Sequence, residues 1–179
     1  MAPGAVVWIT GLSGAGKSTL AEGLTSRLRR TGKPVVMLDG DLLREALGIS
    51  AEQSANYDRR SRCDVALKYS RICRLIACQG TIVVISTISM FKEVYNWNRK
   101  NLPSYFEVYL KVSMKELQRR DSKGIYKRFA DGELKNIAGV DISIDEPAAP
   151  DFLIETDELD ITSIWADMIF QKMKKRKLV

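Results

Sequence analysis

Short apolar segments alternate with longer, more polar segments along this chain. The apolar, β-branched runs at 5–10, 34–39, 81–87, 105–112 and 152–156 have the length of strands. The stretches between them, at 17–30, 58–79, 90–100, 114–120 and 160–175, are predicted to be helices, and in the first of them Leu20, Leu24 and Leu28 recur at helical spacing. Short strands separated by helices indicate a parallel sheet covered on both faces. The pattern therefore predicts an α/β fold with a parallel five-stranded sheet and helices on both faces.

One segment between the last two predicted strands differs from the rest in composition. Residues 121–150 contain "SKG", "DG", "AG" and "EPAAP", which are rich in turn residues and charge. A long connection of this kind is typical of a mobile lid over a ligand site. Since 179 residues are the size of one ordinary domain, we expect a single domain over 1–179 with a lid at about 121–150.

A glycine-rich loop, "GLSGAGKST" at 11–19, follows the first predicted strand directly. Gly11, Gly16, Lys17 and Ser18 match the phosphate-binding pattern G-x-x-x-x-G-K-[ST], the P-loop, whose backbone N–H groups point at phosphate oxygens. In such a loop Lys17 reaches the β and γ phosphates, and the Ser18 hydroxyl binds Mg²⁺. The strand before the loop and the helix after it disfavour the alternative of a plain glycine-rich turn. We expect the nucleotide phosphates to be held by Gly11, Ser13, Gly14, Ala15, Gly16, Lys17, Ser18 and Thr19.

Composition and charge exclude several other classes of protein. No apolar stretch is long enough to span a bilayer, and the N-terminus lacks the basic start and long apolar stretch of a signal peptide. The net charge of +6 could indicate a nucleic-acid partner, but the basic residues are dispersed apart from "KKRK" at 174–177, which we interpret as a frayed, solvated last turn. Cys63, Cys73 and Cys78 lie in one predicted helix at spacings that match no zinc pattern, so we expect reduced packing residues. We therefore expect a cytoplasmic protein with neither a membrane nor a nucleic-acid partner.

Charged residues follow the second predicted strand, in "LDGDLLR" at 38–44. The carboxyl ends of parallel strands meet at one edge of a sheet, so Asp39, Asp41 and Arg44 are expected beside the phosphate loop. A carboxylate there can take a proton from an attacking hydroxyl or order magnesium-bound water, and Arg44 can hold an anionic substrate with two hydrogen bonds. Asp41 could instead cap a helix that starts at Leu42; the adjacent phosphate loop and arginine favour the functional role. The guanine-reading pattern N-K-x-D is absent, which argues against a regulatory GTPase.

Longer motifs in the chain resemble the adenylylsulfate kinases, P-loop kinases that use ATP to phosphorylate the ribose 3′-hydroxyl of adenosine 5′-phosphosulfate. The matching segments are "GLSGAGKST", "LDGDLLR", "LGIS" and "RDSKGIYKRFADGELKNIAGVDISIDEPAAPD", and the similarity runs from about Val7 to Asp151. Many families share the P-loop, but "RD-x-KG-x-Y-K" followed by "G-x-D" and "E-x-P-x-x-P" is specific. The resemblance implies a P-loop kinase fold with ATP and Mg²⁺ as cofactors.

The resemblance also assigns roles to individual residues. Asp41 is similar to the general base of the family, and it acts together with Lys17 in catalysis. Arg120 resembles a residue that packs on the ATP adenine, and Lys123 one that lies near the transferring phosphate. The acceptor nucleotide would be bound by Asp39, Asp41, Arg44, Arg62, Ser89, Met90, Phe91, Lys92, Arg99, Lys127, Lys135 and Ile137.

Several positions depart from the family pattern around the acceptor. Where the family usually has "ISPYR-x-DR", this chain has "ISMFKEVYNWNR", in which only Ser89 and Arg99 persist clearly. Two phenylalanines that sandwich the substrate adenine in the family correspond to Ile49 and Ile137. Stacking of a base on an aromatic ring contributes about 1–3 kcal/mol, so the adenine site should be weak unless Tyr57 or Phe91 substitutes. We expect Trp97, in contrast, to be an ordinary packing residue.

These departures leave the acceptor, and with it the function, open to alternatives. A branch of the same family with "SMFKEV-x-x-WNR" resembles this chain more closely; it acts in bacterial capsule modification and phosphorylates the 3′-hydroxyl of cytidine diphosphoramidate, a pyrimidine that needs no phenylalanine sandwich. We favour this small-molecule acceptor over adenylylsulfate, and we leave a homodimer open as the assembly. The alternative of another class is a nucleotide-binding module without transfer, against which the intact Lys17, Ser18 and Asp41 argue. A shikimate-type kinase shares the P-loop but gives no account of "RDSKGIYKR".

Overall fold

The computed structural model describes residues 2–49, 58–158 and 162–179 and contains one five-stranded sheet. Its strands are β1 (Val6–Thr10), β2 (Val35–Asp39), β3 (Ile82–Thr87), β4 (Tyr105–Lys111) and β5 (Phe152–Glu155). They lie in the order β2-β3-β1-β4-β5, and every pairing is parallel. The predicted parallel five-stranded sheet is confirmed.

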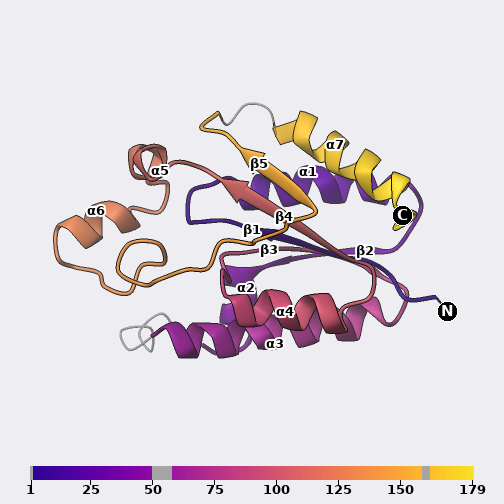
Figure 1. The fold of residues 1–179 in the computed structure, drawn as a ribbon, viewed down its shortest axis with the longest axis horizontal. Coiled ribbons are helices and arrows are strands. Elements are labelled where there is room, and N and C mark those ends of the chain that lie inside the picture. Colours follow the sequence, from indigo (N-terminus) through magenta and orange to yellow (C-terminus); the bar gives the residue numbers. More distant parts are fainter. Residues whose placement is uncertain (1, 50–57, 159–161) are drawn as a thin grey trace.

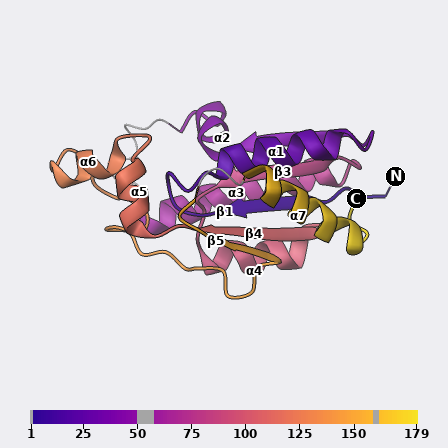
Figure 2. The same ribbon diagram turned by 90° about the horizontal axis from the view of Figure 1, so that it is seen from above.

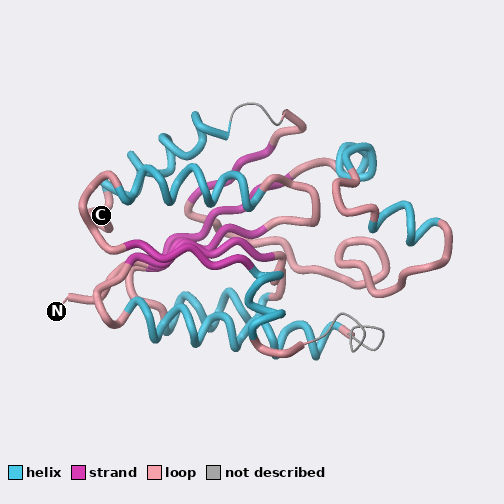
Figure 3. Tube along the Cα trace, turned by 180° about the vertical axis from the view of Figure 1, so that it is seen from behind, coloured by secondary structure: helices cyan, strands magenta, loops and turns pink. Residues whose placement is uncertain are grey.

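Helices cover both faces of this sheet (Figure 1). The helices of the described residues are α1 (Lys17–Arg29), α2 (Gly40–Ala46), α3 (Arg59–Ala77), α4 (Lys92–Asn101), α5 (Met114–Arg120), α6 (Ile125–Ala130) and α7 (Thr162–Lys175), of which α5 and α6 lie beyond the end of the sheet. Figure 3 shows the sheet between α1 and α7 on one side and α3 and α4 on the other. Helix α6 lies inside the predicted lid, where the sequence pattern assigned no helix, and α2 was considered only as an alternative in which Asp41 capped a helix starting at Leu42.

Two separate apolar cores result from the alternation of side chains along each strand. In β1, Val7 and Ile9 pack with α1 and α7, whereas Val6 and Trp8 pack with α3 and α4. All four side chains are fully buried. This burial on both faces explains why the strands read as continuous apolar runs rather than as alternating ones.

The carboxyl ends of the strands point toward α5 and α6, which lie beyond the end of the sheet (Figures 1 and 2). Helix α6 and the loop at 131–150 belong to the segment 121–150 that the sequence predicted as a lid, and α5 directly precedes this segment. Both chain termini lie at the opposite end of the sheet. Within the described parts of the chain, each helix is too short or too polar to cross a bilayer.

The C-terminal basic run differs at one residue from its interpretation as a frayed, solvated turn. Arg176 forms an ion pair with Asp151, and its guanidinium lies 5.4 Å from the ring centroid of the buried Phe106. The residues of the run are exposed, as interpreted, but Arg176 differs because an aromatic ring and a carboxylate from distant segments hold it. The three cysteines are free, but only Cys73 is fully buried, and Cys78 is exposed.

Candidate functional site

A cavity of about 810 Å³ opens at the carboxyl edge of the sheet. It lies between the phosphate loop, the ends of β2 and β3, helices α2 and α3, and the lid. The sequence-predicted residues that line it are Ser13, Gly14, Gly16, Lys17, Ser18, Thr19, Asp39, Asp41, Arg44, Arg62, Ser89, Phe91, Arg120, Lys123, Lys135 and Ile137. Most of the predicted site residues therefore line one open cavity.

The phosphate loop needs glycine at positions where another residue would not fit. A Cβ on Gly11 would lie 2.4 Å from the carbonyl oxygen of Leu110, so the loop can pass β4 only as glycine. Gly16 has a φ of 95° and directly precedes α1, and this left-handed conformation turns the chain into the helix. The N-terminal end of α1 faces the cavity as a result, as an anion site requires.

Lys17 is the cation at the centre of the loop. Its Nζ donates a hydrogen bond of 2.8 Å to the carbonyl oxygen of Leu12. The pKa of Lys17 is lowered to about 8: burial and the positive charge of Lys123 lower it, and the carboxylates of Asp41 and Asp39 act in the opposite direction. The negative charges near Lys17 in the free protein therefore do not compensate for its burial. A bound phosphate would add negative charge and favour the protonated lysine.

Asp39 organises the side of the loop that faces the sheet. Its carboxylate accepts hydrogen bonds of 2.9 Å from the Ser18 hydroxyl, the Ser86 hydroxyl and the backbone N–H of Asp41. Burial acts to raise the pKa of Asp39, but these hydrogen bonds outweigh it and the pKa is lowered, so the group is ionised. The cap of α2 is thus Asp39, and the alternative reading of Asp41 as a helix cap was wrong.

A hydroxyl and a carboxylate side by side are a donor set that suits Mg²⁺. Mg²⁺ prefers oxygen ligands and is usually held by one or two protein groups together with substrate phosphates. Ser18 and Asp39 fit that description, and among the described residues no cluster of three acidic, histidine or cysteine side chains offers an all-protein metal site.

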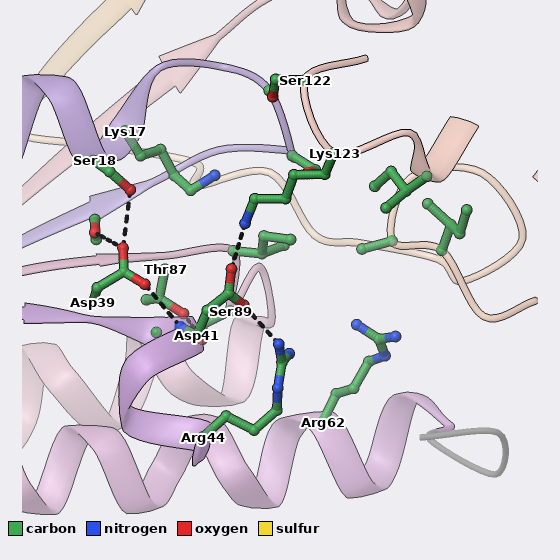
Figure 4. Close-up of a pocket in the computed structure, with 18 of the residues that line it drawn as sticks. Lys17, Ser18, Asp39, Asp41, Arg44, Arg62, Thr87, Ser89, Ser122 and Lys123 are labelled. Atoms are coloured by element: carbon green, nitrogen blue, oxygen red, sulfur yellow. Dashed lines mark hydrogen bonds and ion pairs between the residues drawn. The ribbon is translucent and has the colours of Figure 1, made fainter. Parts of the chain in front are cut away.

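Asp41 lies across the cavity from the loop, in the first turn of α2 (Figure 4). One carboxylate oxygen accepts a hydrogen bond of 2.8 Å from Arg44, and the other pairs with Lys123 of the lid. Burial acts to raise the pKa of Asp41, whereas the hydrogen bond and charge of Lys123 and the charge of Arg44 lower it, and the net change is downward. An ionised carboxylate is therefore held between two cations.

Two arginines from different helices reach toward the same side of the cavity. Arg44 comes from α2 and Arg62 from α3, and Figure 4 shows both side chains directed toward the lid. Arg62 also donates a hydrogen bond of 2.5 Å to the carbonyl oxygen of Asn136 in the lid. These arginines offer hydrogen bonds to an anionic group that enters beside Asp41.

Six of the predicted site residues do not line the cavity: Gly11, Ala15, Met90, Lys92, Arg99 and Lys127. The first two belong to the loop backbone. Met90 is fully buried, and Arg99 binds Asp151 at 2.6 Å and Glu107 at 3.2 Å. Arg99 lies in the last turn of α4, where the helical rise places it about 10 Å along the axis from the end that faces the site. Met90, Lys92, Arg99 and Lys127 therefore lie outside the lining of this cavity, and their contact with the acceptor stays a prediction.

The wall of the cavity includes apolar groups that sequence reasoning largely missed. Among them, Val65, Leu134 and Ala138 lie near the predicted Phe91 and Ile137. In a sequence, an apolar side chain is normally interpreted as part of the core. Only the position of these residues in a helix or in the predicted lid could have indicated that they line a ligand cavity. Ile49 packs on the core of α3 and α4 and does not line the cavity; Tyr57 lies outside the described residues. Trp97 packs on the same core with Arg71 over its ring, as a packing residue would.

Comparisons with known proteins agree on one family. The family model for adenylylsulphate kinase matches residues 3–155. A cytidine diphosphoramidate kinase of Campylobacter jejuni is 44% identical over 144 residues, which cover 80% of this chain and 82% of that protein. An adenylyl-sulfate kinase of Clostridium acetobutylicum is 36% identical and covers 98% of this chain and 86% of its own length. The solved APS kinase of Mycobacterium tuberculosis in complex with AMPPNP and APS superposes with a TM-score of 0.85 at 28% identity, covering 97% of this chain and 99% of its own.

Proposed function

The chain belongs to the adenylylsulfate kinase family of ATP-dependent phosphotransferases, and we propose that it phosphorylates the ribose 3′-hydroxyl of a nucleotide with a phosphate-linked anionic group at its 5′ end. The 3′-oxygen forms a bond to the γ phosphorus of ATP, and the bond from that phosphorus to the β–γ bridging oxygen breaks. Asp41 takes the hydroxyl proton, and ADP leaves with the bridging oxygen. The ionised Asp41 in one cavity with Lys17 is the observation that carries this proposal.

The charges around Asp41 support the division into donor and acceptor. Lys17 lies on the side of the phosphate loop, and Lys123 reaches Asp41 from the lid, so a γ phosphate between them would contact both cations (Figure 4). Arg44 and Arg62 would hold the 5′ anionic group of the acceptor. Bound Mg²⁺, held by Ser18 with Asp39 nearby, would neutralise charge on the phosphates. Together these contacts would hold the acceptor hydroxyl in position next to the γ phosphate before transfer.

Our best candidate for the acceptor is cytidine diphosphoramidate, in capsule modification. The relative from Campylobacter jejuni that bears this name is 44% identical to the chain. Val65 and Ile137 line the apolar wall of the cavity, where the acceptor base would bind. Without two aromatic rings around the base, a pyrimidine loses less stacking energy than a purine does. Because ATP and nucleotide acceptors of this kind are found in the cytoplasm, we place the protein there.

Adenylylsulfate is the alternative acceptor, which would make 3′-phosphoadenylylsulfate the product. It is favoured by the adenylyl-sulfate kinases that are 32–36% identical to the chain. Phe91 lines the cavity and could stack on an adenine. A module that binds ATP without transfer would show neither product.

A direct comparison of acceptors tests the proposal. The protein is incubated with ATP, Mg²⁺ and either cytidine diphosphoramidate or adenosine 5′-phosphosulfate, and the products are read by mass for one added phosphoryl group. We expect kcat/KM for the cytidine compound to be at least about tenfold higher, a difference of ~1.4 kcal/mol in transition-state binding. Efficient turnover of the adenosine compound alone would show that the acceptor is adenylylsulfate. ATP binding with no product from either compound would support a nucleotide-binding module without transfer.

A further inference from the structure

The carbonyl oxygens of the phosphate loop accept hydrogen bonds from side chains at three consecutive residues. Leu12 accepts from Lys17 at 2.8 Å, Ser13 from the Tyr126 hydroxyl at 3.1 Å, and Gly14 from Arg120 at 3.3 Å. Tyr126 belongs to α6 and Arg120 to α5. Two of these three donors therefore come from distant segments: Tyr126 lies in the predicted lid at 121–150, and Arg120 lies directly before it.

The contact with Ser13 sets the direction of one peptide group. In a trans peptide the carbonyl oxygen and the following N–H point opposite ways, and the described chain has no cis peptide bond. When the Ser13 oxygen faces Tyr126, the N–H of Gly14 faces away from it. Ser13 and Gly14 both line the cavity, and inward N–H groups are what a phosphate-binding loop presents to its ligand.

Tyr126 is fixed in place by its own surroundings. Its side chain is 7% exposed and packs in the same core as Ala15 of the loop. The carboxylate of Asp121 accepts hydrogen bonds from the backbone N–H groups of Tyr126 at 3.1 Å and Lys127 at 2.9 Å, which anchors the start of α6. Burial raises the pKa of Tyr126 to about 12, so its hydroxyl stays a hydrogen-bond donor. These contacts hold the phenol ring of Tyr126 between α6 and the phosphate loop.

A second contact joins the lid to the same loop. Gly139 has a φ of 81°, and a Cβ built on it would lie 2.9 Å from two methyl carbons of Leu12. The neighbouring Ile137 and Ala138 line the cavity. The lid therefore touches the donor loop at Leu12 as well as at Ser13.

We propose that Tyr126 is a positioning residue for the phosphate-binding loop: its hydroxyl holds the Ser13–Gly14 peptide so that the Gly14 N–H faces the phosphates of ATP. This role concerns the donor site and does not depend on which acceptor the enzyme uses. It makes the affinity for ATP a property of the lid as well as of the loop. A change in α6 would then weaken phosphate binding through the Tyr126 hydroxyl, which is itself uncharged.

The test compares Tyr126→Phe with Tyr95→Phe. Tyr95 is equally buried, at 8% exposed, and its hydroxyl also donates to a backbone carbonyl, that of Asp145 at 3.2 Å, which lies outside the loop. Dissociation constants for ATP and for inorganic tripolyphosphate are measured by calorimetry without acceptor. A hydrogen bond of this kind predicts a rise of about three- to tenfold for both ligands in Tyr126→Phe and less than about twofold in Tyr95→Phe.

Stability and local exchange separate positioning from a general loss of structure. Melting temperatures of both variants are recorded, and hydrogen exchange of amides 12–17 is followed well below either transition. We expect faster exchange in this loop for Tyr126→Phe only, with unchanged exchange in α3. Wild-type affinity for both ligands in Tyr126→Phe, or an equal loss in Tyr95→Phe, would overturn the proposal, as would weakened binding of ATP with unchanged binding of tripolyphosphate.

Discussion

The lowered pKa of Lys17 predicts that ATP binding depends on pH in a range where few other groups titrate. In the free protein the ammonium loses its proton with a pKa of about 8, whereas the negative charge of a bound triphosphate should restore the ordinary value of about 10.4 or more. ATP then binds the protonated form preferentially. Binding must therefore take up a proton at pH values between the free pKa and the bound pKa.

The size of the effect follows from these two values. At pH 7 about nine-tenths of the lysine is already charged, and at pH 9 only about one-tenth is, so the dissociation constant should rise about tenfold between them, or ~1.4 kcal/mol. The same shift makes the unfolded chain bind more protons between about pH 8 and 10.5. In that window Lys17 makes the free protein more stable as pH rises.

Calorimetry at pH 7.0, 8.0 and 9.0, in buffers of different ionisation enthalpy, measures both quantities. We expect an uptake of about 0.9 proton at pH 9 and about 0.1 at pH 7. Titrations with and without Mg²⁺ separate the lysine from any effect of the metal. Lys17→Arg is the control, because a guanidinium stays charged throughout this range. A flat profile in the wild type, or the same slope in Lys17→Arg, would refute the reasoning.

Three further substitutions test other parts of the structure. Asp41→Asn keeps the size of the side chain but removes its basicity, so kcat should fall by about 10²- to 10⁴-fold while calorimetry shows ATP binding nearly unchanged; wild-type turnover would exclude Asp41 as the base. Ile137→Phe together with Ile49→Phe should shift the kcat/KM ratio toward adenosine 5′-phosphosulfate, mainly through Ile137 because only that residue lines the cavity; an unchanged ratio would contradict the proposed base site. Asp151→Asn removes the carboxylate that pairs with Arg176 and one of the two that pair with Arg99, and urea unfolding should show a loss of about 1–3 kcal/mol, whereas Glu155→Gln, on the exposed edge of β5, should show much less.

Local patterns in the sequence predicted the sheet and the phosphate loop well. Each strand is a short apolar run, and the loop from Gly11 to Ser18 combines a residue pattern with the strand and helix that flank it, so both are encoded by neighbours along the chain. Asp39, Asp41 and Arg44 were expected beside the loop because parallel strands end at one edge, and the structure brings them there. The turn residues also located the segment at 121–150, part of which lines the cavity, and its role as a lid stays a prediction.

Contacts between distant segments were beyond the reach of the sequence. Arg99 matched a family motif, yet it lies at the far end of α4 and binds Asp151, 52 residues away. Arg176 read as a solvated cation for the same reason. Tyr126 belongs to a recognised motif, but its contact with Ser13 spans 113 residues, and nothing in either local sequence indicates that the two meet.

Both termini lie behind the sheet, at the end opposite the lid and the cavity. A surface or a second protein attached through either terminus would therefore face away from the opening through which nucleotides enter, and it would leave room for the lid. The N-terminal attachment disturbs less, because Leu178 and Val179 pack against the core and Arg176 is paired. For immobilised binding assays, and for fusion to an enzyme that supplies the acceptor, the N-terminus is the place to join.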